Sequence, residues 1–563
     1  RLICGRLGID PAAGGAWIFY PGRHNPANTS TNIIDCGECV DALATLLRYG
    51  GEALAAYDRA RLAETITSCC NTYLVANVQD KPIINQRLWG AMGLAAAYAA
   101  LGVPAWAAAV TASIARSLAE MRADGSFPYV TDPTSLGEHP GIADVTVHYH
   151  SRCVGFARYA ATCLGQADAF SEPLRRGADF LCAVLRPDGL KPLGLEGKRW
   201  FWDDDAEAGS AAYDAYVLAA DGRPELRALA TQVAARSLAA VGQDGWVQAT
   251  ARPSFVCRVF HTADLTWLVR AYAAAAWLDG PSPQPSPLQA EGADAPSPPP
   301  SPLQGEAASR QRQVDVEKGE GQPSLHHLAG ARVWQPSGLI RLDAPEACAI
   351  ARASKRAANL LVGGRIGGGG LVYVGRRDGR WSNLLKFVPE PDVPEAAWVH
   401  DPGFGGESLF RLLPRRDPAT RFRLHIARSH WKAGRRAYAL AMLWRFLGRP
   451  AYLAQRRYES SHAMRAEVVA EGPGITVRSG LARLDGTPLP YVTTVRAYRL
   501  ADGRLHVHDR LTTERLLPVL AYRYPEAADG FEVTADAPWR TRGGLLIVGP
   551  LVPGAAATIT YRL

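Results

Sequence analysis

MRADGSFPYV, residues 121–130, is the stretch that decides the predicted fold of the N-terminal half. Its Asp-Gly pair recurs in LRPDGLKPLG (185–194) and VGQDGWVQAT (241–250), roughly 55 to 65 residues apart, about the length of two helices with their loops. Around these turns, residues 32–280 are rich in Ala and Leu, with apolar side chains at the three-to-four spacing of helices. The period therefore predicts a repeat of helical hairpins.

Stacked helical hairpins form either an open solenoid or an α/α toroid, whose inner helices surround a cavity. The composition of the loops favours the toroid. The segments KRWFWDDDAEAG (198–209) and PSFVCRVFHTAD (253–264) are long, aromatic and charged, as expected where loops converge on a ligand cleft. We therefore expect an α/α toroid over residues 1–280.

The amino-acid composition changes at residue 281, after the predicted helical domain. Residues 281–325 are rich in Pro and Ser and contain PSPLQ twice, a composition that predicts a disordered linker or insertion. Residues 326–563 consist of short alternating runs, among them RAYRLADGRLHVHDR (496–510), a hairpin around Asp502-Gly503. Strands at this spacing predict an antiparallel β-sandwich. The expected fold class is thus multidomain α+β, a helical toroid followed by a β-sandwich.

Composition and charge narrow the range of partners. The formal net charge of +8 favours an acidic partner, but the arginines are scattered, so we expect no nucleic-acid surface. The apolar runs are interrupted before the roughly 18 residues that a membrane span needs, so we expect no membrane partner. Cys36 and Cys39 have a metal-like spacing without the second pair that a structural zinc site needs. We predict no cofactor and no metal ligand, which leaves only a structural divalent metal open.

Two segments of the helical half resemble motifs of a known family. INQRLWGAMGLAAAYAALG (84–102) resembles the Asn-His-x-Leu helix of the heparinase II/III-like polysaccharide lyases. DGSF (124–127), followed by HYH (148–150), resembles their Asp-Gly-Ser stretch and Tyr-His pair, although more residues separate the two here. The resemblance implies an α/α toroid before a β-sandwich, an anionic polysaccharide or oligosaccharide as substrate, and a periplasmic or secreted location. The chain begins without Met and without a signal-peptide pattern, so we expect a trimmed start.

The same resemblance implies roles for individual residues. Asn85 takes the place of the amide that neutralises the substrate carboxylate, and Tyr149 that of the catalytic tyrosine. Gln86 stands where the family has histidine, and its amide can still donate to a carboxylate.

Elimination from a uronate makes chemical sense of these residue types. The proton beside the carboxylate becomes acidic only when the carboxylate is neutralised, and Arg152 can assist the two amides. Tyr149 can serve as base or acid if nearby cations lower its pKa from about 10, and His148, His150 and Arg152 are near in sequence. On a helix Tyr149 and Arg152 share a face, whereas both histidines diverge from it. We expect further substrate contacts from these basic and aromatic residues: Arg87, Arg199, Trp202 and His261.

Each candidate also has a structural interpretation. Asn85 could cap the helix that follows Pro82, Tyr149 could be a half-buried aromatic residue, and the histidines could be structural or exposed. A glycoside hydrolase of the same architecture is an alternative function, because the cluster Asp203 to Glu207 could supply a catalytic carboxylate, although a helix cap explains it as well. A non-catalytic glycan-binding protein is the third hypothesis, and Gln86 in place of histidine is its one hint.

Overall fold

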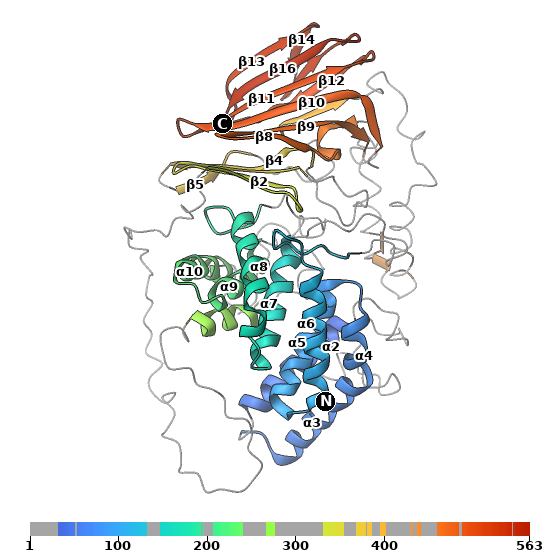
Figure 1. The fold of residues 1–563 in the computed structure, drawn as a ribbon, viewed down its shortest axis with the longest axis vertical. Helices are drawn as coiled ribbons and strands as arrows, with labels where there is room; N and C mark the ends of the chain where they lie inside the picture. The colour runs from blue at the N-terminus through green and yellow to red at the C-terminus, as the bar shows by residue number, and fades with distance from the viewer. Residues whose placement is uncertain are drawn as a thin grey trace.

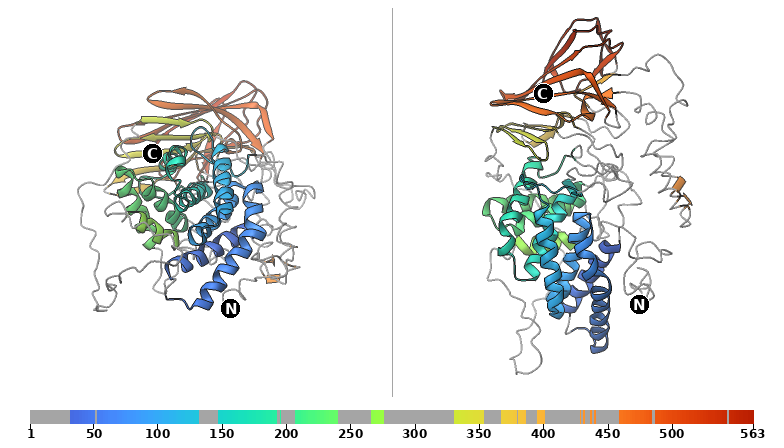
Figure 2. Two further views of the ribbon diagram at one scale, coloured as in Figure 1. Left: turned by 60° about the horizontal axis from the view of Figure 1, so that its bottom comes forward. Right: turned by 45° about the vertical axis from the view of Figure 1, so that its right-hand side comes forward.

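The computed structural model places a helical domain beneath two stacked β-sheets, with the smaller sheet between the helices and the larger one (Figures 1 and 2). The predicted fold class, helical hairpins followed by an antiparallel β domain, is confirmed by this arrangement. The structure describes these residues: 32–50, 53–131, 147–192, 195, 207–239, 266–275, 330–353, 367–378, 380–385, 395–400, 428, 431, 436–437, 439–440, 459–483, 487–542 and 544–563. The predicted linker, 281–325, lies outside them.

The helical domain consists of paired inner and outer helices. Its helices are α2 (Asn32–Tyr49), α3 (Ala56–Cys69), the π-helix η3 (Cys70–Leu74), α4 (Val75–Asp80), α5 (Ile84–Leu101), α6 (Pro104–Ala119), α7 (Val147–Cys163), the 3-10 helix η5 (Asp168–Phe170), α8 (Ser171–Val184), α9 (Glu207–Ala220) and α10 (Pro224–Ala239). Residues 266–275 are also helical. Helices α2, α5, α7 and α9 form an inner row, in which each helix contacts the next one. Helices α6, α8 and α10 pack on the outside of α5, α7 and α9, respectively. This alternation is the one expected for a toroid.

Aromatic and charged side chains fill the space between the inner helices. Trp267 lies 5.2 Å from the ring of Phe156 on α7 and stacks at 5.2 Å on Tyr213 of α9. Arg270, one turn later, forms an ion pair with Asp41 of α2 at 2.6 Å. Residues 266–275 therefore contact α9 and α2, the last and the first of the inner helices named above.

The two described Asp-Gly turns have the same hydrogen bonding, which confirms the predicted repeat. Asp124 accepts a hydrogen bond from the backbone N–H of Ser126 at 3.1 Å, and Asp188 accepts one from Leu190 at 3.3 Å. The glycine that follows each aspartate has φ of 82°, a left-handed conformation that favours glycine. The third turn, at Asp244, lies outside the described residues.

Two antiparallel sheets form the C-terminal domain. The five-stranded sheet has the order β1 (Gly330–Trp334), β2 (Leu339–Asp343), β3 (Ala347–Arg352), β4 (Gly370–Asp378) and β5 (Arg380–Asn383). The eleven-stranded sheet contains β6 (Ala397–His400), β7 (Glu459–Ser460), β8 (Glu467–Glu471), β9 (Gly474–Arg483), β10 (Pro488–Ala501), β11 (Arg504–Thr513), β12 (Leu520–Arg523), β13 (Asp529–Ala535), β14 (Trp539–Arg542), β15 (Leu545–Val548) and β16 (Ala556–Arg562). The predicted hairpin at Asp502-Gly503 is confirmed, since Ala501 pairs with Arg504 across the β10–β11 turn.

The central strands of the five-stranded sheet are buried on both faces, whereas the edge strands β1 and β5 are partly exposed. In β3, Cys348 and Ile350 belong to the core of the helical domain, whereas Ala349 and Ala351 belong to the core shared with the larger sheet. This alternation follows from the two-residue period of a strand, which sends neighbouring side chains to opposite faces. The helices and the larger sheet are therefore packed against the same thin layer.

Polar contacts also join the helices to this layer. Arg341 of β2 donates to the carbonyl groups of Cys182, Ala183 and Leu185 at 3.2, 3.0 and 2.5 Å, at the C-terminal end of α8. Carbonyl groups at a helix C-terminus lack partners within the helix and attract a cation. The Asp-Gly turn at Asp124 makes a second contact, because its Oδ2 accepts from the N–H of Ser337 at 3.0 Å.

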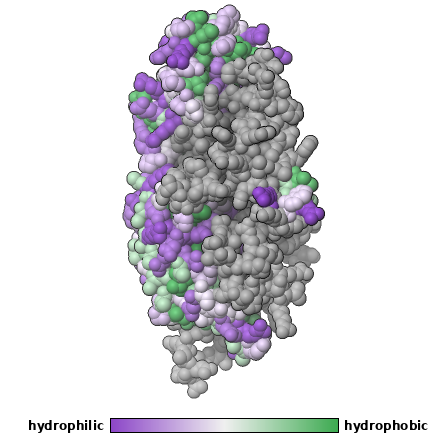
Figure 3. Space-filling view, turned by 90° about the vertical axis from the view of Figure 1, so that its right-hand side faces the viewer, coloured by the Kyte–Doolittle hydropathy of each residue, from purple (hydrophilic) through white to green (hydrophobic). Residues whose placement is uncertain are grey.

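The surface gives little further indication of a partner. Figure 3 shows hydrophilic and hydrophobic side chains interspersed over the described part of one face. Within the described ranges, no helix combines the length and apolar character that crossing a bilayer requires.

Candidate active site

Asn85 and Gln86 lie in the first turn of α5, on the end of the helical domain near the Asp-Gly-Ser turn. The helix begins at Ile84, and its cap residue is Ile83, which has extended backbone and no capping side-chain bond. The N–H of Ile84 donates to the carbonyl of Tyr129 at 3.3 Å, so the segment after the Asp-Gly turn satisfies the helix end. The interpretation of Asn85 as a helix cap is therefore wrong, since Asn85 is already inside the helix.

Both amides are buried but have unused hydrogen-bonding capacity. Asn85 is 2% exposed and Gln86 is 6% exposed. Neither Oδ1 of Asn85 nor Oε1 of Gln86 has a hydrogen-bond partner among the residues that the structure describes. A buried polar atom without a partner costs free energy, so such atoms often mark a place where a ligand binds.

Tyr149 lies in the first turn of α7, next to Tyr129. The two rings are 5.7 Å apart, and Tyr149 is 9% exposed. Burial, together with the charge that Tyr149 would carry, raises the pKa of the Tyr129 hydroxyl well above its usual value. Tyr129 is a residue that the sequence did not single out, although it follows DGSF by only two positions.

Arg152 lies one turn after Tyr149 and is surrounded by three rings. Its guanidinium carbon is 5.4 Å from the ring of Tyr149, 4.6 Å from Tyr213 of α9 and 5.9 Å from Trp89 of α5. Cations at such distances are attracted to the negative ring faces. The predicted pairing of Tyr149 with Arg152 on one helix face is confirmed. Tyr213 was not predicted, because it lies on a helix remote in sequence.

Trp89 of α5 contacts both neighbouring inner helices, α7 and α2. It lies one turn after Asn85 on α5, and its ring is 4.9 Å from Phe156 of α7. Its indole N–H donates to the carboxylate of Glu38 on α2 at 2.5 Å. Tyr129 contacts both helix starts, because its carbonyl accepts from Ile84 and its ring lies 5.7 Å from that of Tyr149. The first turns of α5 and α7, which carry Asn85 and Tyr149, therefore lie at the same end of neighbouring helices.

His150 is a core residue. Its Nδ1 accepts from the N–H of Phe127 at 3.4 Å, its Nε2 lies 2.8 Å from the carbonyl of Gly177, and its ring packs edge-on against Phe180. These partners require the tautomer in which Nε2 carries the proton. Burial lowers the pKa of His150 to about 4, so the ring is neutral near pH 7. This geometry favours a structural role for His150 over a catalytic one.

Arg87 is also fully enclosed, on the side of α5 that faces α6. It donates to Ser117 at 2.9 Å, to the carbonyl of Lys81 at 3.0 Å and to Glu120 at 2.7 Å. Burial lowers the pKa of Arg87 despite the Glu120 carboxylate. The guanidinium is engaged in holding α5 to α6, which favours a structural role for Arg87 over the predicted substrate contact.

Several predicted site residues lie outside the described part of the chain. They are Arg199, Trp202, Asp203, Asp204, Asp205 and His261, and for His148 and Glu207 the structure describes the helical backbone but not the side chain. Their predicted roles stay predictions. Among the residues that the structure does describe, no group of three or more His, Cys, Asp or Glu side chains is placed to hold a metal ion.

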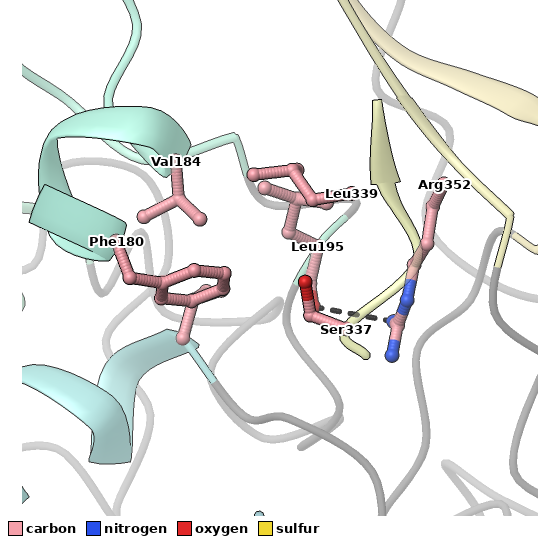
Figure 4. A pocket seen from close by; sticks show the side chains of 7 residues that line it. Phe180, Val184, Leu195, Ser337, Leu339 and Arg352 are labelled. Atoms are coloured by element: carbon pink, nitrogen blue, oxygen red, sulfur yellow. Dashed lines mark hydrogen bonds between the residues drawn. The ribbon is translucent and has the colours of Figure 1, made fainter. Parts of the chain in front are cut away.

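The first residue of α7 borders a pocket at the junction with the five-stranded sheet. In Figure 4, Phe180 and Val184 of α8 face Leu195, Leu339 and Arg352 across it, and Val147 completes the lining together with Ser337. Arg352 of β3 donates to the carbonyl of Leu195 at 3.4 Å. The end of α7 that carries Tyr149 is therefore the end that faces the sheet.

Comparisons with solved structures find similar chains. The protein is similar to a heparan sulfate lyase from Pedobacter heparinus (11% identity, TM-score 0.44, 94% of this chain and 68% of that chain). It is also similar to a chondroitin AC lyase from Streptomyces coelicolor (12% identity, TM-score 0.46, 96% and 72%) and to a heparinase III (10% identity, TM-score 0.43, 94% and 69%).

In fold, the chain resembles polysaccharide lyases. No protein-family model matches the sequence, and no curated protein matches it either.

Proposed function

We propose that the protein is a polysaccharide lyase that cleaves an acidic, uronate-containing glycan by β-elimination. The observation that carries the proposal is the pair of buried amides, Asn85 and Gln86, whose side-chain oxygens accept a hydrogen bond from no described residue. They lie at a helix start that contacts Tyr129, whose ring also contacts Tyr149, and the ring-enclosed cation Arg152 follows Tyr149 by one turn. The net charge of +8 supports an anionic substrate.

The amides would act on the carboxylate of the uronate. Removing the adjacent proton moves charge onto the carboxylate oxygens, and donors aimed at them stabilise the transition state more than the ground state. A side-chain amide presents either its oxygen or its NH₂ group to a ligand, depending on the last torsion angle. Asn85 and Gln86 would therefore turn NH₂ groups to the carboxylate, and Arg152 would add positive charge.

Tyr149 would handle the protons. As a phenolate it removes the proton beside the carboxylate, and as a phenol it protonates the departing glycosidic oxygen, so the C–O bond breaks as the C=C bond forms. The guanidinium of Arg152, 5.4 Å from the ring centre of Tyr149, would supply positive charge beside the phenolate during proton removal. The products are a new reducing end and an unsaturated uronate.

A panel of uronate-containing polysaccharides tests the proposal. We expect ultraviolet absorbance from the unsaturated uronate to rise with at least one of them, in step with new reducing ends. Reducing ends without absorbance would replace the proposal with hydrolysis. Binding without either product would replace it with a glycan-binding function.

Replacing Tyr149 by Phe tests the role of the hydroxyl. Loss of a general acid or base slows an enzyme by about 10²–10⁴-fold, so we expect Tyr149→Phe to lower kcat by that factor and to leave substrate binding nearly unchanged. Tyr159→Phe is the matched control, because Tyr159 is on the same helix and its hydroxyl bonds Asp41 at 3.2 Å. A fully active Tyr149→Phe variant would rule out this assignment.

A further inference from the structure

Lys191 is a buried lysine just beyond the second Asp-Gly turn, outside the groups that the proposed chemistry uses. Its side chain is 2% exposed, as is that of its ion-pair partner, Asp214 of α9, at 2.8 Å. Burying a charge is costly unless it is paired and hydrogen-bonded, so a lysine at this depth needs a complete set of acceptors.

The other acceptors of Lys191 belong to the first turn of α7. Its Nζ donates to the carbonyl of Val147 at 3.2 Å and to the hydroxyl of Ser151 at 2.9 Å. Together with Asp214, the acceptors within the described residues are as many as the three N–H groups of an ammonium. Ser151 also donates to Asp214, which closes the network.

The electrostatics of α7 do not explain a cation at this point. The N-terminus of a helix carries partial positive charge, so a lysine there is unfavourable to the helix itself. Asp214 neutralises the lysine, and the pair adds little net field. What the pair supplies is a fixed geometry.

The position of the network connects it to the candidate site from two sides. Val147 and Ser151 lie two residues before and two residues after Tyr149 on the same turn. Asp214 directly follows Tyr213, whose ring lies 4.6 Å from the guanidinium of Arg152. Lys191 therefore ties the turn that carries Tyr149 to the helix that holds Arg152 in place.

We propose that Lys191 is a positioning residue for Tyr149, acting through Val147, Ser151 and Asp214; its catalytic consequence rests on the proposed lyase function. Displacing a catalytic group by about 1 Å costs on the order of 10²-fold in rate. Loss of Lys191 should thus lower kcat while leaving KM nearly unchanged, because the residue touches no substrate.

The test uses a double variant, because Lys191→Met alone would leave Asp214 buried and unpaired. In Lys191→Met with Asp214→Asn, the uncompensated charge is absent, and we expect a folded protein. We expect kcat to fall by about 10- to 100-fold with KM within about threefold.

The matched control is Arg158→Met with Asp221→Asn. This ion pair, at 3.2 Å, joins a later part of α7 to the residue that follows α9, and Arg158 also donates to the carbonyl of Ala220 at 3.0 Å. We expect the control to keep wild-type kcat. A Lys191 double variant with wild-type kcat would overturn the proposal, as would an equal fall in both variants.

Hydrogen exchange separates this proposal from the proposed function. Amides of residues 151–154, whose helical acceptors are the carbonyls of the first turn of α7, should exchange faster in the Lys191 double variant than in wild type. They should be unchanged in the Arg158 double variant. Unchanged exchange in the Lys191 variant would overturn the anchoring role. A wild-type protein without lyase activity would overturn the proposed function but leave this anchoring measurable.

Discussion

Asn85 and Arg87 lie two positions apart in the first turn of α5, and both are buried, yet their hydrogen bonding differs completely. Toward α6, Arg87 donates to Ser117, Lys81 and Glu120. On the face shared with Trp89, the oxygen of Asn85 has no partner in the described part of the chain. The contrast teaches that a buried polar group does not by itself mark a site. Unused hydrogen-bonding capacity is the more informative sign.

The largest effect expected from this contrast is on catalysis. Asn85→Ala removes a donor to the developing charge, so we expect kcat/KM to fall by about 10²–10³-fold. The free energy of unfolding should change little, because the Asn85 oxygen gives up no described hydrogen bond. Rates on the active polysaccharide and thermal unfolding measure the two quantities.

Asn71→Ala is the matched control for Asn85→Ala. Asn71 accepts from the indole of Trp106 at 2.8 Å, so its loss should cost about 1 kcal/mol of stability without slowing the reaction. An Asn85→Ala variant with a lower free energy of unfolding but wild-type kcat/KM would show that Asn85 has a structural role, as Arg87 does.

The next effect concerns His150 and the dependence of stability on pH. Its pKa is about 4 in the fold against 6.5 unfolded, so the unfolded chain binds the extra proton between these values. Stability from this group is therefore complete above about pH 6.5 and falls by about 3 kcal/mol as the pH drops to 4.

Urea unfolding of wild type and His150→Gln across that range measures the effect. We expect the variant to be less stable at pH 7 but to depend less on pH. Parallel curves for the two proteins would contradict a buried, neutral His150.

The smallest effect concerns Arg87. Arg87→Met removes its hydrogen bonds to Ser117 and Glu120 and should lower the free energy of unfolding by about 2 kcal/mol. Glu120 is 17% exposed and keeps its contact with Arg116, which limits the cost. The kcat of the folded variant should equal that of wild type. An Arg87→Met variant with a lower kcat but wild-type stability would show instead that Arg87 belongs to the active site.

Local patterns in the sequence were sufficient for the repeat and for one residue pair of the site. The Asp-Gly turns, the Asp502-Gly503 hairpin and the Tyr149–Arg152 spacing each depend on residues close along the chain. The period of a helix and the residue preferences of turns depend only on residues close along the chain, so they can be read from the sequence.

The rest of the site depends on contacts between distant segments. Glu38 reaches Trp89 across 51 positions, and Lys191 reaches Val147 across 44. No periodicity encodes such contacts. His150 shows the same limit, because its neighbours Phe127 and Gly177 are brought to it only by packing, and it is the resulting burial that lowers its pKa.

The five-stranded sheet, whose central strands are buried on both faces, has a consequence for thermal unfolding. Neither the helices nor the larger sheet can lose this layer without exposing apolar residues such as Ile350 or Ala349 to water. Arg341 adds to the coupling, because the last carbonyl groups of α8 depend on a strand of the other domain. Two domains linked through a shared layer should unfold in one cooperative transition, and calorimetry should show a single heat-absorption peak.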